Sequence, residues 1–193
     1  MRCYWHMAML LILQYCQGCI EADPGRLTRI DDGRLLPERW SEALTTVDHD
    51  GWRRLSSDAL YVKRPINLND AYQPTKARPW IHTWYRFWPS GHVLQCWQYT
   101  AEPDLASPSA NDADDFSERE HRIASVGRYR VRGDHLEMEF IGYHEGGSTF
   151  VREKAQLNPD GSFTVFATQW LPASADLTCR PHPVQGMRRY PDW

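Results

Sequence analysis

Two carboxylates, Glu137 and Glu139, have the spacing that first suggests chemistry in this sequence. Paired carboxylates can act as a general acid and a general base. Both residues lie in a segment that we predict to be one strand of a β-hairpin, so their side chains would share a face. A tight turn at Gly133 would place Arg130 and Arg128 directly opposite them. We therefore interpret the pair as a solvated row of cross-strand ion pairs and not as a catalytic site.

A third carboxylate, Glu153, is expected to point into the protein. The turn at residues 158–161, with the sequence Asn-Pro-Asp-Gly, favours a hairpin in which Leu157 lies opposite Phe163. The period of two then puts Glu153 on the same apolar face as these residues. A buried carboxylate requires a partner or a raised pKa. Glu153 would either orient a ligand or accept a hydrogen bond from a buried tyrosine or tryptophan.

The remaining motifs predict neither an enzyme nor a metal site. The 193 residues contain no Gly-x-Ser-x-Gly elbow, no His-Glu-x-x-His pair and no phosphate-binding loop. The histidines are scattered, and two of them, His92 and His135, flank turns, where solvent exposure is expected. The formal net charge of −3 provides no basic surface for nucleic acid. We therefore expect no catalytic residue, no metal, no cofactor and no nucleic-acid partner.

Residues 80–100 give the clearest structural prediction, a β-hairpin. Pro89 suits the first central position of a type I turn, and Gly91 suits the left-handed position of the bulge that follows. We expect the odd-numbered face to fill the core, whereas Trp80, Trp84 and Trp88 would lie on the outer face. The pairs predicted on the inner face are Phe87 with Val93, Tyr85 with Gln95, Thr83 with Trp97, and Ile81 with Tyr99.

The N-terminus has the order of a secretory signal peptide. Arg2 precedes a short apolar run at residues 7–13, which is too brief to span a membrane. The following Gly18-Cys19 resembles the lipobox of bacterial lipoproteins, in which the cysteine becomes lipidated, although the two residues before Gly18 depart from the usual pattern. A plain signal ending near Ala22, or a start-site artefact, is the alternative. We expect residues 1–18 to be a signal peptide, Cys19 to carry lipid and residues 19–36 to be a membrane tether.

The cysteines that remain after the N-terminal segment are Cys96 and Cys179. An even pair in an exported protein favours one disulfide, and two buried free thiols are the alternative. The bridge would draw residues 171–186 across the outer, even-numbered face of the opening hairpin.

The whole pattern predicts an all-β fold. A strand at residues 59–64 and hairpins at residues 80–100, 126–143 and 149–170 suggest an antiparallel meander of about eight strands closed into a barrel. A short helix is expected at residues 37–46, and residues 37–193 would form a single domain.

Two of these hairpins carry a family resemblance. Residues 85–93, YRFWPSGHV, look like the "YRFYPDGTV" hairpin of bacterial lipocalin-like lipoproteins, and residues 127–136, GRYRVRGDHL, look like their "GxYxxxGDxL" hairpin. The resemblance implies a lipocalin-like barrel that binds a small apolar ligand inside, or a partner protein at its rim, without catalysis. The expected inward contacts are Tyr85, Phe87, Trp97, Tyr99, Tyr129, Met138 and Glu153.

A lipid anchor would place the protein in the bacterial cell envelope. Ile20 follows the predicted lipidation site, and the absence of Asp there favours the outer membrane, with the domain facing the periplasm. An alternative function is a periplasmic inhibitor or immunity-type module, because exposed tryptophans and an acidic loop at residues 101–117 would suit contact with another envelope protein.

Overall fold

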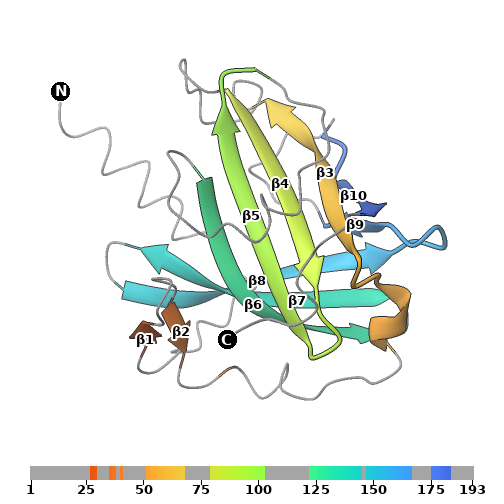
Figure 1. Cartoon of the computed structure of the whole chain (residues 1–193), viewed down its shortest axis with the longest axis horizontal. Coiled ribbons are helices and arrows are strands. Elements are labelled where there is room, and N and C mark those ends of the chain that lie inside the picture. The colour runs from red at the N-terminus through yellow and green to blue at the C-terminus, as the bar shows by residue number, and fades with distance from the viewer. Residues whose placement is uncertain are drawn as a thin grey trace.

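The computed structural model shows an all-β protein whose main body is a closed, eight-stranded antiparallel barrel (Figure 1). The structure describes residues 27–29, 35–37, 40, 51–67, 79–102, 122–144, 147–166 and 175–183. Around the barrel the strands follow the order β10-β3-β4-β5-β6-β7-β8-β9. Their bounds are β3 Ala59–Asn67, β4 Trp80–Phe87, β5 His92–Thr100, β6 Arg122–Arg132, β7 His135–His144, β8 Gly147–Leu157, β9 Phe163–Val165 and β10 Thr178–Pro183. The predicted fold class and strand number are confirmed.

The turns set the register of the hairpins as the sequence predicts. Gly91, Gly133 and Gly161 all have positive φ angles, which only glycine adopts without strain. The β4–β5 ladder contains every pair predicted for it. The β6–β7 ladder places Arg130 opposite Glu137, and the β8–β9 ladder places Leu157 opposite Phe163, again as predicted.

The first barrel strand is longer than predicted because it continues through Pro65. The β3–β4 register shifts between Lys63 and Ile66, which marks a bulge. Proline has no backbone N–H to give to a ladder, so a bulge is where a strand tolerates it. The strand therefore runs on to Asn67 and reaches the start of β4.

The barrel sheet is buried on both faces. Its inner face forms a core of aromatic and aliphatic side chains that includes Tyr85, Phe87, Tyr129 and Met138. The odd-numbered face of the first hairpin is thus the inner face, as predicted. A second, outer cluster lies on the opposite face of the same sheet; its members are Leu60, Trp84, Trp88, Leu94, Cys96, Val126, Ile141 and Phe150.

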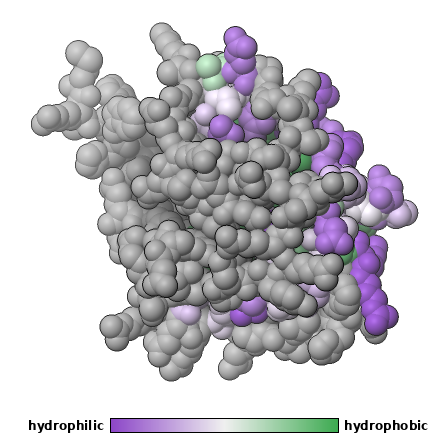
Figure 2. Space-filling view, in the orientation of Figure 1, coloured by the Kyte–Doolittle hydropathy of each residue, from purple (hydrophilic) through white to green (hydrophobic). Residues whose placement is uncertain are grey.

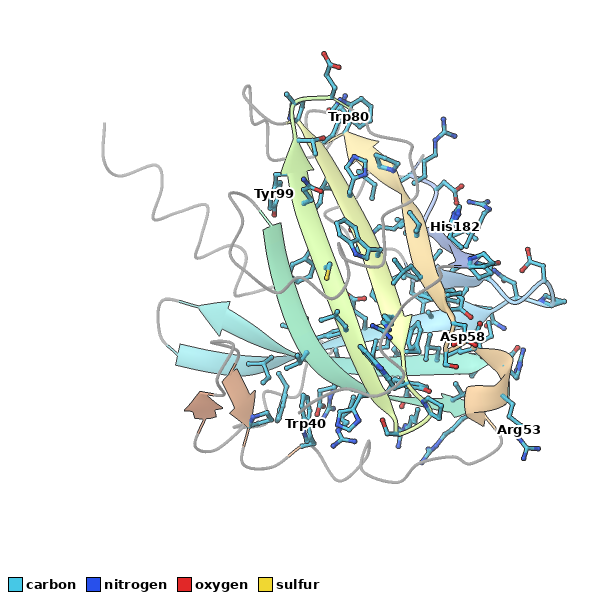
Figure 3. The ribbon with its side chains drawn as sticks, viewed as in Figure 1. Trp40, Arg53, Asp58, Trp80, Tyr99 and His182 are labelled. Atoms are coloured by element: carbon cyan, nitrogen blue, oxygen red, sulfur yellow. The ribbon has the colours of Figure 1, made fainter. Side chains whose placement is uncertain are left out.

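The two ends of the barrel differ in burial. At one end the 3-10 helix η1 (Gly51–Arg54) precedes the buried Leu55, and the backbone N–H of Ser56 donates to the Tyr61 hydroxyl at 2.7 Å. At the other end β4 begins and β5 finishes, and side chains there are only half-buried. Figure 3 shows Trp80 and Tyr99 at this second end, which we call the mouth, and Arg53 and Asp58 at the first. On the side where β9, β10 and η1 lie, the described surface is mainly hydrophilic (Figure 2).

The predicted disulfide is absent. Cys96 and Cys179 are both free and buried, Cys96 in the outer cluster and Cys179 in the inner core. From β10 to β5 the barrel wall crosses three strand spacings of about 4.8 Å each, whereas a disulfide needs Cα atoms within about 7 Å. The prediction failed because it rested on the number of cysteines, which does not indicate that Cys96 faces outward and Cys179 inward.

The predicted course of the C-terminal tail is therefore also wrong. Residues 178–183 form β10, which pairs with β3 and β9 and closes the barrel. They do not cross the outer face of the first hairpin. Trp40 packs against the outer cluster, where its ring stacks on Phe150 of β8 at a centroid distance of 5.9 Å.

The N-terminal predictions fall largely outside the described residues. The structure does not describe Cys19, the segment 1–18, most of the residues 37–46 predicted as a helix, or most of the acidic loop. Within the described residues, Pro37 ends β2 (Leu35–Pro37), which pairs with β1 (Leu27–Arg29) in the segment predicted as a tether. Among all the residues that the structure describes, no helix is both long and apolar enough to cross a membrane.

Candidate ligand site inside the barrel

An aromatic floor fills the barrel near its closed end. The Phe87 ring packs against those of Tyr129, Tyr61 and Phe163 at centroid distances of 5.0, 5.3 and 5.7 Å. All four side chains are at most 3% exposed. Edge-to-face and tilted contacts of this kind pack tightly, so these side chains fill this part of the interior.

Above the floor, a polar bridge crosses the interior from β4 and β5 to β8. The Tyr85 hydroxyl donates to Glu153 Oε2 at 2.9 Å, and Gln95 Nε2 donates to Glu153 Oε1 at 2.8 Å. Gln95 Nε2 also lies 2.9 Å from the Tyr85 hydroxyl. Burial, followed by the negative charge of Glu153, raises the pKa of Tyr85 well above its usual value. Tyr85 therefore stays protonated and keeps donating to the carboxylate.

Between the bridge and the mouth, inward-facing residues form an upper compartment. We define it by Lys63, Thr83, Ile81, Trp97 and Tyr99, which the β3–β4 and β4–β5 registers place on the inner face. Lys63 and Thr83, next to the bridge, are buried, and the other three are half-buried. The exposure of the inward side chains of β4 and β5 therefore increases towards the mouth, whereas Ile66 of β3, which pairs with Ile81, is buried.

The predicted ligand contacts divide into two groups. Phe87, Tyr129 and Met138 belong to the filled floor, where they touch other core side chains. Tyr129 also donates its hydroxyl to the carbonyl of Trp88 at 2.8 Å. The second group lies nearer the mouth; it consists of the half-buried Trp97 and Tyr99, with Tyr85 and Glu153 bonded to each other in the bridge.

Two polar residues of the interior, Gln95 and Lys63, were not singled out from the sequence. Gln95 was placed on the inner face but not recognised as a donor to Glu153, because the two lie on different hairpins. Lys63 lies two positions after Tyr61, and strand residues two positions apart point to the same face. This alternation could have indicated from the sequence that Lys63 points inward. Its burial also depends on β10, since Lys63 pairs with Cys179.

The carboxylates on the outer face are not both solvated, contrary to the prediction. Glu137 bonds to Arg130 as expected, with the Arg130 Nε at 2.5 Å. Glu139, however, is 0% exposed; it forms an ion pair with Arg152 of β8 at 2.8 Å, and Arg128 lies opposite it on β6 as predicted. On the same outer face Arg86 is 1% exposed, and its guanidinium carbon lies 4.5 Å from the centroid of the Trp88 ring. The outer face is thus a second packed layer that includes charged groups.

The histidines do not gather into a site. Among the described residues, no group of three or more His, Cys, Asp or Glu side chains could hold a metal ion. His135 is exposed, as predicted. His92 is half-buried, and burial together with the positive charge of Arg128 lowers its pKa to about 4.

Comparisons with known proteins do not extend this description, because no family model, curated protein or solved structure matches the chain. The half-buried aromatic side chains at the mouth and the half-buried Glu153 carboxylate, held by Tyr85 and Gln95, are compatible with a ligand-binding barrel.

Proposed function

We propose that this protein is a non-catalytic binding protein that takes a small, largely apolar molecule into the upper compartment of its barrel. The observation that supports this best is the burial gradient on the inner face. Trp97, Tyr99 and Ile81 face inward but stay half-buried, whereas the floor beneath the Tyr85–Glu153 bridge is filled. Half-buried aromatic side chains around an accessible interior gain contact area when a ligand covers them.

The polar bridge suits binding better than catalysis. Each oxygen of Glu153 already accepts a hydrogen bond, so the carboxylate is held in one orientation. Such a group can fix the pose of a ligand, and the described residues around it supply no nucleophile paired with a base. The inner face at this level therefore offers a recognition surface.

Fluorescence titration with N-phenyl-1-naphthylamine, a neutral aromatic probe that brightens in apolar surroundings, tests the proposal. Trp97 and Trp80 form a matched pair, because both are half-buried near the mouth but lie on opposite faces of the sheet. We expect Trp97→Ala to weaken probe binding about tenfold and Trp80→Ala to leave it nearly unchanged. Absence of probe binding to the wild-type protein, or equal weakening by both substitutions, would refute the proposal.

We also propose that the barrel is anchored to the outer membrane through lipid on Cys19 and faces the periplasm. The Gly18-Cys19 sequence after a short apolar run supports this. Mass spectrometry of the N-terminal peptide from the membrane fraction tests it. An unmodified Cys19, or an N-terminus created by cleavage near Ala22, would contradict the anchor without affecting the binding proposal.

A further inference from the structure

The upper compartment contains one buried cation, Lys63. It lies on the inner face because its β10 partner Cys179 and its β4 partner Thr83 are 0% and 1% exposed and directly paired residues share a face. Lys63 itself is 8% exposed. It sits on the mouth side of the Tyr85–Glu153 bridge, since Thr83 precedes Tyr85 along β4 by two positions.

The ammonium group of Lys63 has no acceptor among the described residues. No hydrogen bond or ion pair joins it to any of them, although a lysine ammonium carries three donors. Two other polar side chains of the interior, Glu153 and Tyr85, are bonded to each other. The ammonium is not one of the fully buried side-chain atoms that lack a partner, so it keeps contact with water and stays open to an acceptor.

The charges around Lys63 limit what could complete it. Burial raises the pKa of the Cys179 thiol to about 12, so this neighbour is neutral and cannot serve as a counter-ion. The same thiol feels the positive charges of Lys63 and Arg180 and the negative charges of Glu153 and Asp176, so charges of both signs lie in this region. The carboxylate of Glu153 disfavours a second negative charge nearby, so a singly charged acid fits better than a doubly charged phosphate.

We infer that the ligand is a monoanion with an apolar or aromatic body, whose carboxylate reaches Lys63 while its body lies against Trp97, Tyr99 and Ile81. This inference rests on the proposed function, since it requires a ligand in the upper compartment. It adds that the ligand is negatively charged and that Lys63 is the residue that binds this charge. The acid supplies the acceptor that Lys63 lacks, and the aromatic walls cover the rest of the molecule.

Isothermal titration calorimetry with three probes of one size tests the inference, namely 1-naphthoate, neutral 1-naphthamide and the cation 1-naphthylmethylammonium. We expect the wild-type protein to bind the carboxylate at least about tenfold more tightly than the amide, and the cation least. Lys63→Met should abolish the preference for the acid and leave amide binding within about twofold. Lys154→Met is the matched control, because Lys154 is exposed on the outer side of β8 beside Glu153.

Each result has a separate meaning. Equal binding of acid and amide by the wild-type protein, or an undiminished preference in Lys63→Met, would overturn the inference but keep the proposed function. Binding of none of the three probes would refute the proposed function as well. Methionine matches the length of the lysine stem and removes a buried charge, so the variant is expected to fold. The wild-type preference is in any case measured without it.

Discussion

Tyr85 and Glu153 meet across the interior of the barrel, where the tyrosine hydroxyl of β4 donates to the carboxylate of β8 at 2.9 Å. The two residues lie on separate hairpins, so this bond ties together opposite walls of the barrel. It also lies between the aromatic floor and the half-buried inward side chains near the mouth. Its contribution to stability can be tested by removing a single oxygen atom.

The first prediction concerns that oxygen. Tyr85→Phe removes the donor and leaves Glu153 Oε2 with a lost bond, so we expect the free energy of unfolding to fall by about 1–2 kcal/mol. Urea denaturation measures the change. Tyr99→Phe is the control, because Tyr99 is half-buried and its hydroxyl has no hydrogen-bond partner among the described residues. A loss of equal size in both variants would show that the bond does not stabilise the barrel.

The buried ion pair on the outer face should matter more than a surface pair. Arg152→Met would leave the fully buried Glu139 carboxylate without its arginine, which we expect to destabilise the protein by roughly 3 kcal/mol. Asp176→Asn breaks the more exposed Arg180–Asp176 pair and should cost less than about 1 kcal/mol. Thermal and urea unfolding of the two variants compare these values directly. Similar costs would contradict the burial of Glu139.

Gly127 allows β6 and β7 to approach closely. A Cβ atom built there would lie 2.6 Å from Phe140 Cδ1 and would also overlap the carbonyl oxygen of Glu139. We therefore expect Gly127→Ala to destabilise the barrel by about 3 kcal/mol or to prevent folding. At Gly133 a Cβ has nothing within 4 Å, and only the positive φ angle opposes it. Gly133→Ala should cost about 1 kcal/mol, and circular dichroism during urea titration measures both.

The two cysteines should behave as protected thiols and not as a bridge. Iodoacetamide should label neither Cys96 nor Cys179 in the native protein, because both are at most 1% exposed. In denaturant without a reducing agent, mass spectrometry should find both labelled. A requirement for reductant before either residue reacts would show that a disulfide had formed.

Stability should decline at alkaline pH. The Cys179 thiol has its pKa raised by burial from 9.0 to about 12, so between these values the unfolded chain has released a proton that the folded chain retains. The contribution of the Cys179 thiol to the free energy of unfolding is fully present below pH 9 and is lost as the pH rises towards 12. Burial likewise raises the pKa values of Tyr85 and Tyr129.

Urea midpoints measured from pH 8 to 11 test this, and Cys179→Ala should reduce the slope. A flat profile would indicate that these groups are exposed to water.

The local structure could be predicted from the sequence because the turns determine it. Once Gly91, Gly133 and Gly161 are assigned to left-handed positions, the pairing of each hairpin follows by counting residues. The inward direction of Glu153 follows from the same count within its own hairpin. These statements depend on residues that are close in sequence.

The remaining features depend on contacts between distant segments. Cys179 was misplaced because its face is set by pairing with Lys63, far away in the chain. Glu139 was expected to be solvated because nothing in its own hairpin shows that the outer face is covered. The role of Lys63 required both the β3 register and the barrel closure by β10. The register within a hairpin depends on residues that are close in sequence. The closure of the barrel and the covering of its outer face depend on residues that are far apart.

The seam where the barrel closes has a consequence for how the protein forms. β9 contains three residues, and its ladder with β10 joins only Thr178 with Thr164 and Cys179 with Phe163. The β10–β3 ladder unites the beginning and the end of the barrel strands, so it can form only after the loop that contains all the others has closed. We expect closure to be the slow step of folding. In the native state the amide hydrogens of β9 and β10 should exchange with solvent earlier than those of the β7–β8 ladder. Lys63, the residue proposed to bind the charge of the ligand, lies in this β10–β3 ladder. We therefore expect the binding site to be complete only when the barrel has closed.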